Sequence, residues 1–291
     1  MKSVTVKTII VLLFLSAGAY FIQPGLRQNK NRITLSIYAS GDFAEPLKAL
    51  VSAFERIERK VKVEVTQDDP AILVNLVLKE KKSPDLFISP GEKEIWHLSR
   101  QGKLDIKSIK EFGRYELVLI APADSKKVNN LKDLFTDQVE TFTIVNPDYN
   151  SIGAYAIIAL TKLGYWEQLQ KSKLIMFTNT HIEALSFISA HKADAGIHYR
   201  VSPFKTNLGK IFNQQIKIFA TLPLDSCPPI RNYIAVLNES KNKLLAESFI
   251  DFIFSSKGRK ILSKYGLDND DESNGGNTGS VDSKVLIQDG P

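Results

Sequence analysis

A regular alternation of strand-like and helix-like segments, beginning at Ile33, constrains the fold most. Residues 33–39 place apolar side chains two positions apart, whereas 43–57 repeat them at helical spacing, with Pro46 early enough for the first turns. The alternation predicts further strands at 61–66, 85–89, 115–122, 141–147, 216–223 and 233–237, and helices at 71–81, 91–101, 152–164, 241–256 and 257–265, and it holds through 173–199. Strands separated by helices of this length predict an α/β architecture of parallel sheet with helices on both faces.

The number of sheets stays open at this point. Two sheets would form two lobes, with the chain crossing near 115–122 and returning near 216–223 as two extended hinge strands. A single seven-stranded sheet fits the same periodicity. We find no internal sequence repeat.

The amino terminus resembles a secretory signal peptide. Lys2 and Lys7 precede an apolar run over 9–19 that ends in small residues, and the run is shorter than the roughly 20 residues of a membrane span. We expect residues 1–19 to be the signal, with an uncleaved anchor as the alternative. No cysteine follows the run to carry a lipid, and Cys227 is the sole thiol, so stability after export must come from core burial.

The carboxyl terminus differs in composition from the rest of the chain. Residues 268–291 carry six acids against Lys284 and are rich in Gly, Ser and Asn, so we expect an acidic, disordered tail. The formal net charge of the whole chain is +6. Its basic residues are dispersed without interleaved aromatic residues, which argues against binding to nucleic acid.

Motifs of catalysis are missing. The chain has no nucleophile elbow, phosphate-binding loop, zinc-protease motif or spaced cysteine pair, so we expect no enzyme, no catalytic residues, no cofactor and no metal centre. His97, His181 and His191 fall at isolated positions on predicted helices, where surface or boundary positions are expected. His198 differs because it lies at the carboxyl end of a predicted strand, where open α/β sheets place ligand contacts.

Three junctions between a strand and a helix carry polar residues. Ser40 ends the first strand, and a hydroxyl beside unpaired N–H groups can hold an anion or simply cap the helix. The segment 150–153 forms a similar junction, and the two can face each other across a cleft. The third junction, 68–70, is interpreted first as a turn and helix start with a capping carboxylate, and second as a carboxylate pair facing a cleft.

Seven collinear segments over residues 33–267 resemble one family, the substrate-binding proteins of molybdate and tungstate importers. They are YASGDFAEPLKALVSAFER, SPDLFISPGEKEIWHLSRQGKL, ELVLIAP, NPDYNSIGAYAIIALTKLGYWEQL, ADAGIHYR, CPPIRNYIAVL and FIDFIFSSKGRKILSKYGL. The resemblance implies a two-lobed periplasmic-binding-protein fold of type II, with a ligand cleft and two hinge crossings. We expect residues 33–118 and 222–267 in lobe 1, and 119–221 in lobe 2.

The resemblance also implies ligand contacts. Ser40 matches the family's first serine, and Tyr199 matches the tyrosine of its G-I-x-Y motif. Ile152 and His198 stand where the family offers a main-chain N–H. The second serine is replaced, because Asp69 and Pro70 occupy that turn. Proline has neither a hydroxyl nor an N–H, and the aspartate adds negative charge.

The predicted function is an extracytoplasmic, monomeric protein that delivers a small oxyanion, molybdate or tungstate, to an ABC permease in the inner membrane. Because of Asp68, Asp69 and His198, a metal cation or small organic solute is the alternative cargo. A further alternative is a periplasmic sensor or partner-binding module that has lost transport.

Overall fold

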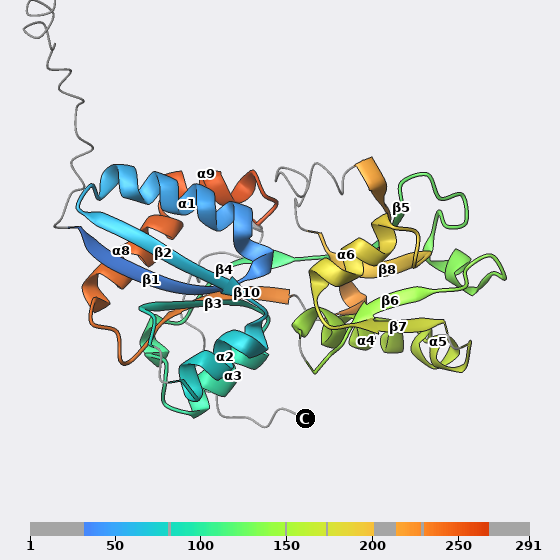
Figure 1. The fold of residues 1–291 in the computed structure, drawn as a ribbon, viewed down its shortest axis with the longest axis horizontal. Helices are drawn as coiled ribbons and strands as arrows, with labels where there is room; N and C mark the ends of the chain where they lie inside the picture. The colour runs from blue at the N-terminus through green and yellow to red at the C-terminus, as the bar shows by residue number, and fades with distance from the viewer. Residues whose placement is uncertain are drawn as a thin grey trace, which may run out of the picture. The chain divides into compact units, whose positions relative to one another are not determined.

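The computed structural model describes residues 32–80, 83–148, 150–172, 174–200, 214–227 and 230–267. The predicted signal peptide at 1–19 and acidic tail at 268–291 lie outside these residues. None of the described helices is long and apolar enough to cross a membrane. From Ile33 onward the described residues belong to one unit, and their strands form two five-stranded sheets rather than a single sheet of seven (Figure 1).

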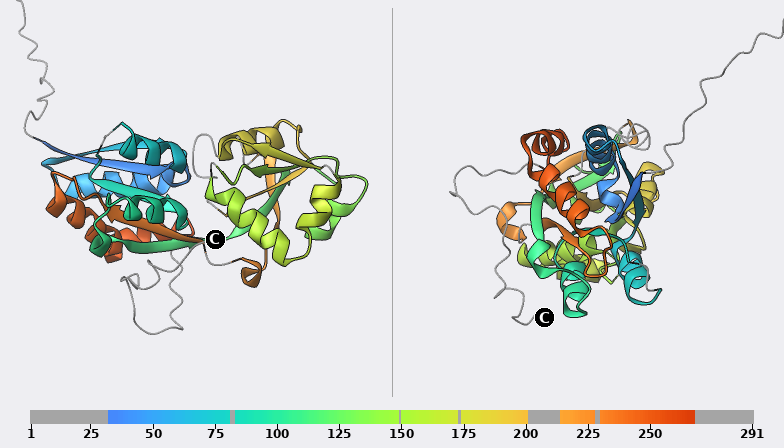
Figure 2. Two further views of the ribbon diagram at one scale, coloured as in Figure 1. Left: turned by 90° about the horizontal axis from the view of Figure 1, so that it is seen from below. Right: turned by 90° about the vertical axis from the view of Figure 1, so that its left-hand side faces the viewer.

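The first sheet has the strand order β2-β1-β3-β10-β4. Its strands are β1 (Ile33–Ser40), β2 (Val61–Asp68), β3 (Leu86–Pro90), β4 (Lys110–Tyr115) and β10 (Ile230–Val236). β1 pairs in parallel with β2 and β3, whereas β10 is antiparallel to β3 and β4. The helices beside it are α1 (Ala44–Ile57), α2 (Pro70–Leu78), α3 (Lys93–Arg100), α8 (Lys243–Phe254) and α9 (Ser256–Ser263) (Figures 1 and 2). We call this sheet and its helices the first lobe.

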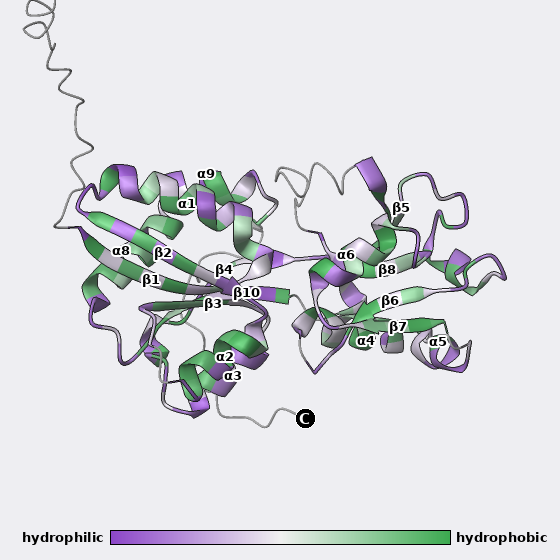
Figure 3. Cartoon of the chain, viewed as in Figure 1, coloured by the Kyte–Doolittle hydropathy of each residue, from purple (hydrophilic) through white to green (hydrophobic). Residues whose placement is uncertain are grey.

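The alternation of side chains along β1 explains the two helical layers of the first lobe. Leu35 and Ile37 lie in the core that includes α1, α8 and α9, whereas Tyr38 lies in a separate core with residues of α2 and α3. A strand covered on both faces buries apolar side chains on each of them. Figure 3 shows hydrophobic colour on much of β1 and β3, with hydrophilic stretches on the surrounding helices.

The second sheet has the order β7-β6-β8-β5-β9 and repeats the first sheet's plan, in which the fourth strand alone is antiparallel to its neighbours on both sides. Its strands are β5 (Leu117–Pro122), β6 (Phe142–Val145), β7 (Ile175–Thr178), β8 (Ala195–Tyr199) and β9 (Ile216–Thr221). Its helices are α4 (Ser151–Lys162), α5 (Trp166–Ser172) and α6 (His181–Ser189). We call this sheet and its helices the second lobe. Short 3-10 helices, η1 (Gly41–Phe43), η2 (Ile106–Ser108), η3 (Leu131–Phe135) and η5 (Leu224–Ser226), complete the described elements.

The prediction of parallel sheet is confirmed for three strands of each sheet, but both sheets also contain antiparallel pairs and are therefore mixed. The chain passes from β4 in the first sheet to β5 in the second at Glu116, so the predicted strand at 115–122 is confirmed as β5 from Leu117 onward. It returns from β9 to β10, and strands that run back between lobes add antiparallel pairs. β4 was not predicted because the apolar residues of its sequence KEFGRY, Phe112 and Tyr115, lie three apart, which does not match a strand's period of two.

Gly153 allows α4 to pack closely on β6. A Cβ added there would lie 1.9 Å from the carbonyl oxygen of Val145, so a side chain would push the start of α4 off the sheet. We expect Gly153→Ala to lower the free energy of unfolding by about 1–3 kcal/mol, the usual cost of overpacking. Urea denaturation measures this. The control, Thr161→Ala at an exposed position of the same helix, should change stability by less than about 0.5 kcal/mol.

Candidate functional site

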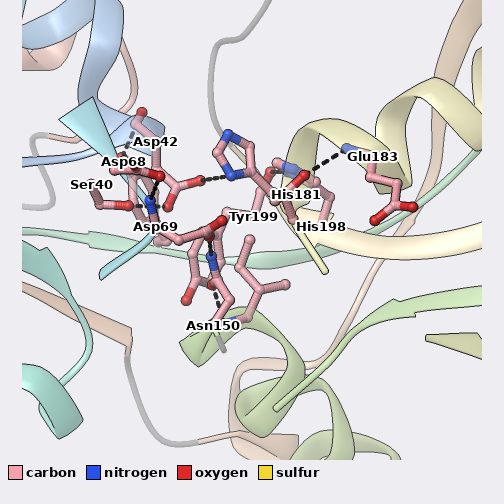
Figure 4. Close-up of polar contacts among 12 residues, drawn as sticks. Ser40, Asp42, Asp68, Asp69, Asn150, His181, Glu183, His198 and Tyr199 are labelled. Atoms are coloured by element: carbon pink, nitrogen blue, oxygen red, sulfur yellow. Dashed lines mark hydrogen bonds and ion pairs between the residues drawn. The ribbon is translucent and has the colours of Figure 1, made fainter. Parts of the chain in front are cut away.

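Polar residues from both lobes meet where strands end or helices begin. β1 ends at Ser40, β2 leads into Asp69, and β8 ends at His198 and Tyr199. Asp42, Asn150 and His181, which follow the strands β1, β6 and β7 in the chain, lie beside these residues. We call the whole group the strand-end cluster (Figure 4). Its members are Ser40, Asp42, Asp69, Asn150, His181, His198 and Tyr199. Ligands of open α/β sheets bind at this edge.

Ser40 is fully buried, and its hydroxyl is already engaged. Its Oγ donates to Oδ2 of Asp42 over 2.7 Å and does not cap η1. Asp42 is also buried, and its other oxygen, Oδ1, has no hydrogen-bond partner among the described residues. The serine therefore fixes one carboxylate oxygen and leaves the second free.

His181, the first residue of α6, faces that free oxygen from the second lobe. Its Nδ1 lies 4.0 Å from Asp42 Oδ1, and 13% of its side chain is exposed. His181 is half-buried, as expected of a boundary position, but it is not isolated, because its ring at the start of α6 faces Asp42 (Figure 4). His97 and His191 are exposed, as expected.

Asp69 makes a hydrogen bond between the lobes. Its Oδ1 accepts from Asn150 Nδ2 over 3.0 Å. The first interpretation of this junction, a capping carboxylate, is wrong: α2 begins at Pro70 as predicted, but Asp69 makes no side-chain cap. Burial raises the pKa of Asp69, while the bond from Asn150 and the nearby His181 act against that rise. Pro70 is buried and offers no donor.

Ile152 lies next to the cluster, but its N–H has a partner. It donates over 3.0 Å to Oδ1 of Asn150, which caps α4. The N–H of Asp69 likewise donates over 2.8 Å to Oδ1 of Asp68. At both junctions where the sequence suggested a ligand, a main-chain N–H already donates to a neighbouring side chain.

His198 is buried, and the hydrogen bond of its ring determines which nitrogen carries the proton. Nδ1 lies 3.1 Å from the carbonyl oxygen of Tyr199, and because a carbonyl only accepts, Nδ1 is the donor. Burial, together with neighbouring His181, lowers the pKa of His198 to about 4. The neutral ring therefore leaves Nε2 as an acceptor, and Nε2 has no partner in the described parts of the chain.

Tyr199 is held rigidly and keeps its proton. Its ring stacks on Tyr115 with centroids 4.9 Å apart, and Tyr115 OH reaches the main-chain oxygen of Asp42 at 3.4 Å. Burial raises the pKa of Tyr199 well above its usual value, with Asp42 adding to the effect. The hydroxyl of Tyr199, 1% exposed as a residue, has no hydrogen-bond partner among the residues described and is a free donor.

A second group of contacts also joins the lobes. Ser151 Oγ donates to Glu94 Oε2 over 3.1 Å, and Ser89 donates to the same oxygen over 3.3 Å. Burial raises the pKa of Glu94, against the effect of these donors. Lys93 Nζ donates to the carbonyl oxygen of Pro147 over 3.2 Å. The two lobes therefore contact each other through polar side chains in this structure.

Four buried polar atoms of the cluster lack a hydrogen-bond partner within the described residues: Asp42 Oδ1, His181 Nδ1, His198 Nε2 and Tyr199 OH. Buried polar groups are ordinarily paired, so these four atoms from two lobes make the strand-end cluster the candidate ligand site. No group of three or more His, Cys, Asp or Glu among the described residues is arranged to hold a metal ion. The chemistry available is hydrogen bonding and charge.

The structure brings together four of the predicted site residues, Ser40, Asp69, His198 and Tyr199 (Figure 4). Pro70 follows Asp69 directly, and the N–H of Ile152 is bound to Asn150, another member of the cluster. Sequence reasoning missed Asp42 and His181. Each lies within three residues of the end of a strand, Ser40 for one and Thr178 for the other, which is a signal that could have found them.

Comparison with known proteins agrees with this architecture. The family model described as bacterial extracellular solute-binding protein matches residues 35–268. A Bacillus subtilis protein, YvgL, provisionally described as an ABC transporter substrate-binding lipoprotein, is 22% identical over 263 residues, covering 88% of this chain and 96% of its own. A molybdate-binding protein of Haemophilus influenzae is 25% identical over 243 residues, covering 80% of this chain and 89% of its own.

Among solved structures, the periplasmic molybdate-binding protein of Azotobacter vinelandii superposes with a TM-score of 0.68 at 21% identity, covering 80% of this chain and 98% of its own. That likeness shows the two-lobed α/β periplasmic-binding-protein fold. With two mixed five-stranded sheets and a family match over most of its length, the chain belongs to the bacterial extracellular solute-binding proteins, which bind solutes for ABC transporters and are not enzymes.

Proposed function

We propose that this chain captures one small oxyanion of the molybdate and tungstate class between its lobes and delivers it to an ABC permease in the inner membrane. The observation that carries the proposal is the group of four buried atoms without a hydrogen-bond partner in the strand-end cluster. One belongs to the first lobe, Asp42 Oδ1, and three belong to the second, His181 Nδ1, His198 Nε2 and Tyr199 OH. A ligand enclosed there would touch both lobes at once, so binding would favour their closed arrangement.

The choice of an oxyanion is supported by the relatives and by the Tyr199 hydroxyl. A relative described as molybdate-binding shares 25% identity over most of the chain. The Tyr199 hydroxyl is buried, keeps its proton and has no hydrogen-bond partner among the described residues, so it can donate to a desolvated anion, while the Ser40 hydroxyl holds Asp42. We also propose that the mature chain begins near Tyr20 and works outside the cytoplasm, in keeping with the family's description as extracellular.

A second candidate cargo is a small cationic solute. Asp42 and Asp69 are both buried in the cluster, and no lysine or arginine of the described chain forms a salt bridge with either. Two carboxylates in a desolvated site attract a cation and repel a dianion. This observation favours a metal ion or an organic ammonium compound over an oxyanion that keeps no proton.

Calorimetric titration separates the two candidates. The purified chain is titrated with molybdate, tungstate, sulfate and phosphate, then with divalent metals and small amines. One molybdate or tungstate bound per chain supports the first candidate. Silence toward every oxyanion together with a response to a cation supports the second.

Removing either hydroxyl is expected to weaken oxyanion binding. Ser40→Ala leaves Asp42 Oδ2 without its donor, and Tyr199→Phe removes a free donor, so each should cost about 1–3 kcal/mol of binding free energy. The matched control is Tyr38→Phe, since Tyr38 lies in the core on the α2 and α3 side of β1. Unchanged affinity in both site variants would contradict the assignment of the site.

A further inference from the structure

Of the four atoms of the strand-end cluster that lack a hydrogen-bond partner, Asp42 Oδ1 and His198 Nε2 are acceptors and Tyr199 OH is a donor. The fourth, His181 Nδ1, lies 4.0 Å from Asp42 Oδ1, so apart from this contact the free acceptors outnumber the free donors. The Ser40 hydroxyl hydrogen is directed to Asp42, and the Ile152 N–H to Asn150. An oxyanion that carries no proton offers acceptors only, so it meets a site with the wrong balance of donors.

The charges around Asp42 do not correct this balance. The described groups that titrate and face it or interact with it electrostatically are His181 on α6, His198 and Tyr199 on β8, Tyr115 on β4, and Asp69 before α2 with neighbouring Asp68. His181 is the cation-forming side chain within 4.0 Å of Asp42 Oδ1. Asp69 adds a second buried carboxyl group to the same site.

We propose that the oxyanion binds together with one proton, which lies between Asp42 Oδ1 and an oxygen of the ligand. This rests on the oxyanion function proposed above. Ser40 donates to Oδ2, which leaves Oδ1 as the oxygen that shares the proton. One proton reduces the negative charge that Asp42 and the bound oxyanion carry together by one. It also turns the contact between their two acceptor oxygens into a hydrogen bond.

The shared proton can come from solvent or from the ligand itself, and the hydrogen bond that results is the same in both cases. Molybdate and tungstate keep no proton at neutral pH, so Asp42 must take one from solvent as they bind. Phosphate retains a proton at neutral pH and can bring its own, whereas sulfate cannot. The site should therefore prefer phosphate to sulfate by at least tenfold at pH 7.5, although the two are close in size and shape.

The pH dependence follows from linkage. Because the complex with molybdate holds one more proton than its separate components, its affinity falls as pH rises, by tenfold for each unit. A site whose donors all stay protonated over pH 6 to 8 would instead bind a dianion with an affinity that does not change with pH in this range.

The test is calorimetric titration of the purified chain with molybdate between pH 6 and 8, in two buffers of different ionisation enthalpy, which counts protons. Wild type should take up one proton per molybdate. Asp42→Asn, which presents an amide donor of the same shape, should bind molybdate at least tenfold more tightly at pH 8, without proton uptake. His181→Gln should keep the uptake, and thermal unfolding checks that both variants fold.

Three outcomes would overturn the proposal. Wild type could bind molybdate with a flat pH profile, no proton uptake and no preference for phosphate over sulfate, in which case the oxyanion function stands alone. Proton uptake that persists in Asp42→Asn but vanishes in His181→Gln would move the proton to His181. Absence of any oxyanion binding at every pH, in wild type and in Asp42→Asn, would remove the proposed function as well.

Discussion

Replacing Gly41 with leucine is expected to weaken oxyanion binding by at least 100-fold, or about 2.7 kcal/mol. A Cβ added at Gly41 lies 3.0 Å from Cε1 of His181 in the second lobe, and the rest of a leucine side chain has to occupy the space where the lobes meet. A wedge there should hold the lobes apart, so the ligand would lose its contacts with His198 and Tyr199. Calorimetric titration with molybdate measures the loss.

Two controls separate the wedge from general damage. Gly41→Ala adds only the atom at 3.0 Å from a side-chain ring that can shift, so its effect should be much smaller. Thermal unfolding of the ligand-free Gly41→Leu chain should stay close to wild type, since the obstacle lies between lobes and not inside one. Wild-type affinity in Gly41→Leu would mean that the ligand is not enclosed between the lobes.

Replacing Phe249 with alanine is expected to lower the free energy of unfolding by about 3–5 kcal/mol. Phe249 is fully buried on α8, and the edge of its ring packs on Phe54 of α1 with centroids 5.0 Å apart and planes at 89°. The change would leave a large cavity between α1 and α8. Urea denaturation measures it, with Leu244→Ala on the same helix as control, because Leu244 is 83% exposed and its loss should be nearly neutral.

The same variant tests our proposal that residues 33–118 and 222–267 fold as one lobe. Hydrogen exchange in Phe249→Ala should become faster first in α1 and β10, because α8 contacts both elements directly and Phe249 packs on Phe54 of α1. β6 and α4 should keep their protection longer. Equal loss of protection in both lobes would contradict the proposed division.

Periodicity predicted most of the fold because the central strands are rich in apolar residues and alternate with helices. β1, β3 and β6 lie close to their predicted positions for that reason. It failed at β4, whose two apolar residues lie three apart, and it did not separate the end of β4 at Tyr115 from the start of β5 at Leu117. The pairing direction of β10 was not predictable either, since a strand's side-chain pattern is the same whichever way its neighbours run.

The candidate site was less predictable than the fold. Ser40, His198 and the junction at Asp69 were found because they end strands or precede a helix, whereas Tyr199 was found from its match to the family's G-I-x-Y motif. Asp42 and His181 were not, because what joins them is a contact between residues 139 positions apart in the numbering, and only the folded chain brings such side chains together. The polar partner of Asp69 proved to be Asn150 rather than its own helix for the same reason.

The most direct test of capture between the lobes is a crystal structure of the chain grown with tungstate, since tungsten is located without ambiguity from its anomalous scattering. The result we predict is one strong peak per chain, with ligand oxygens in hydrogen-bond range of Tyr199 OH and Asp42 Oδ1. A peak on the outer surface, or none in crystals of a chain that binds tungstate in solution, would contradict the proposed site.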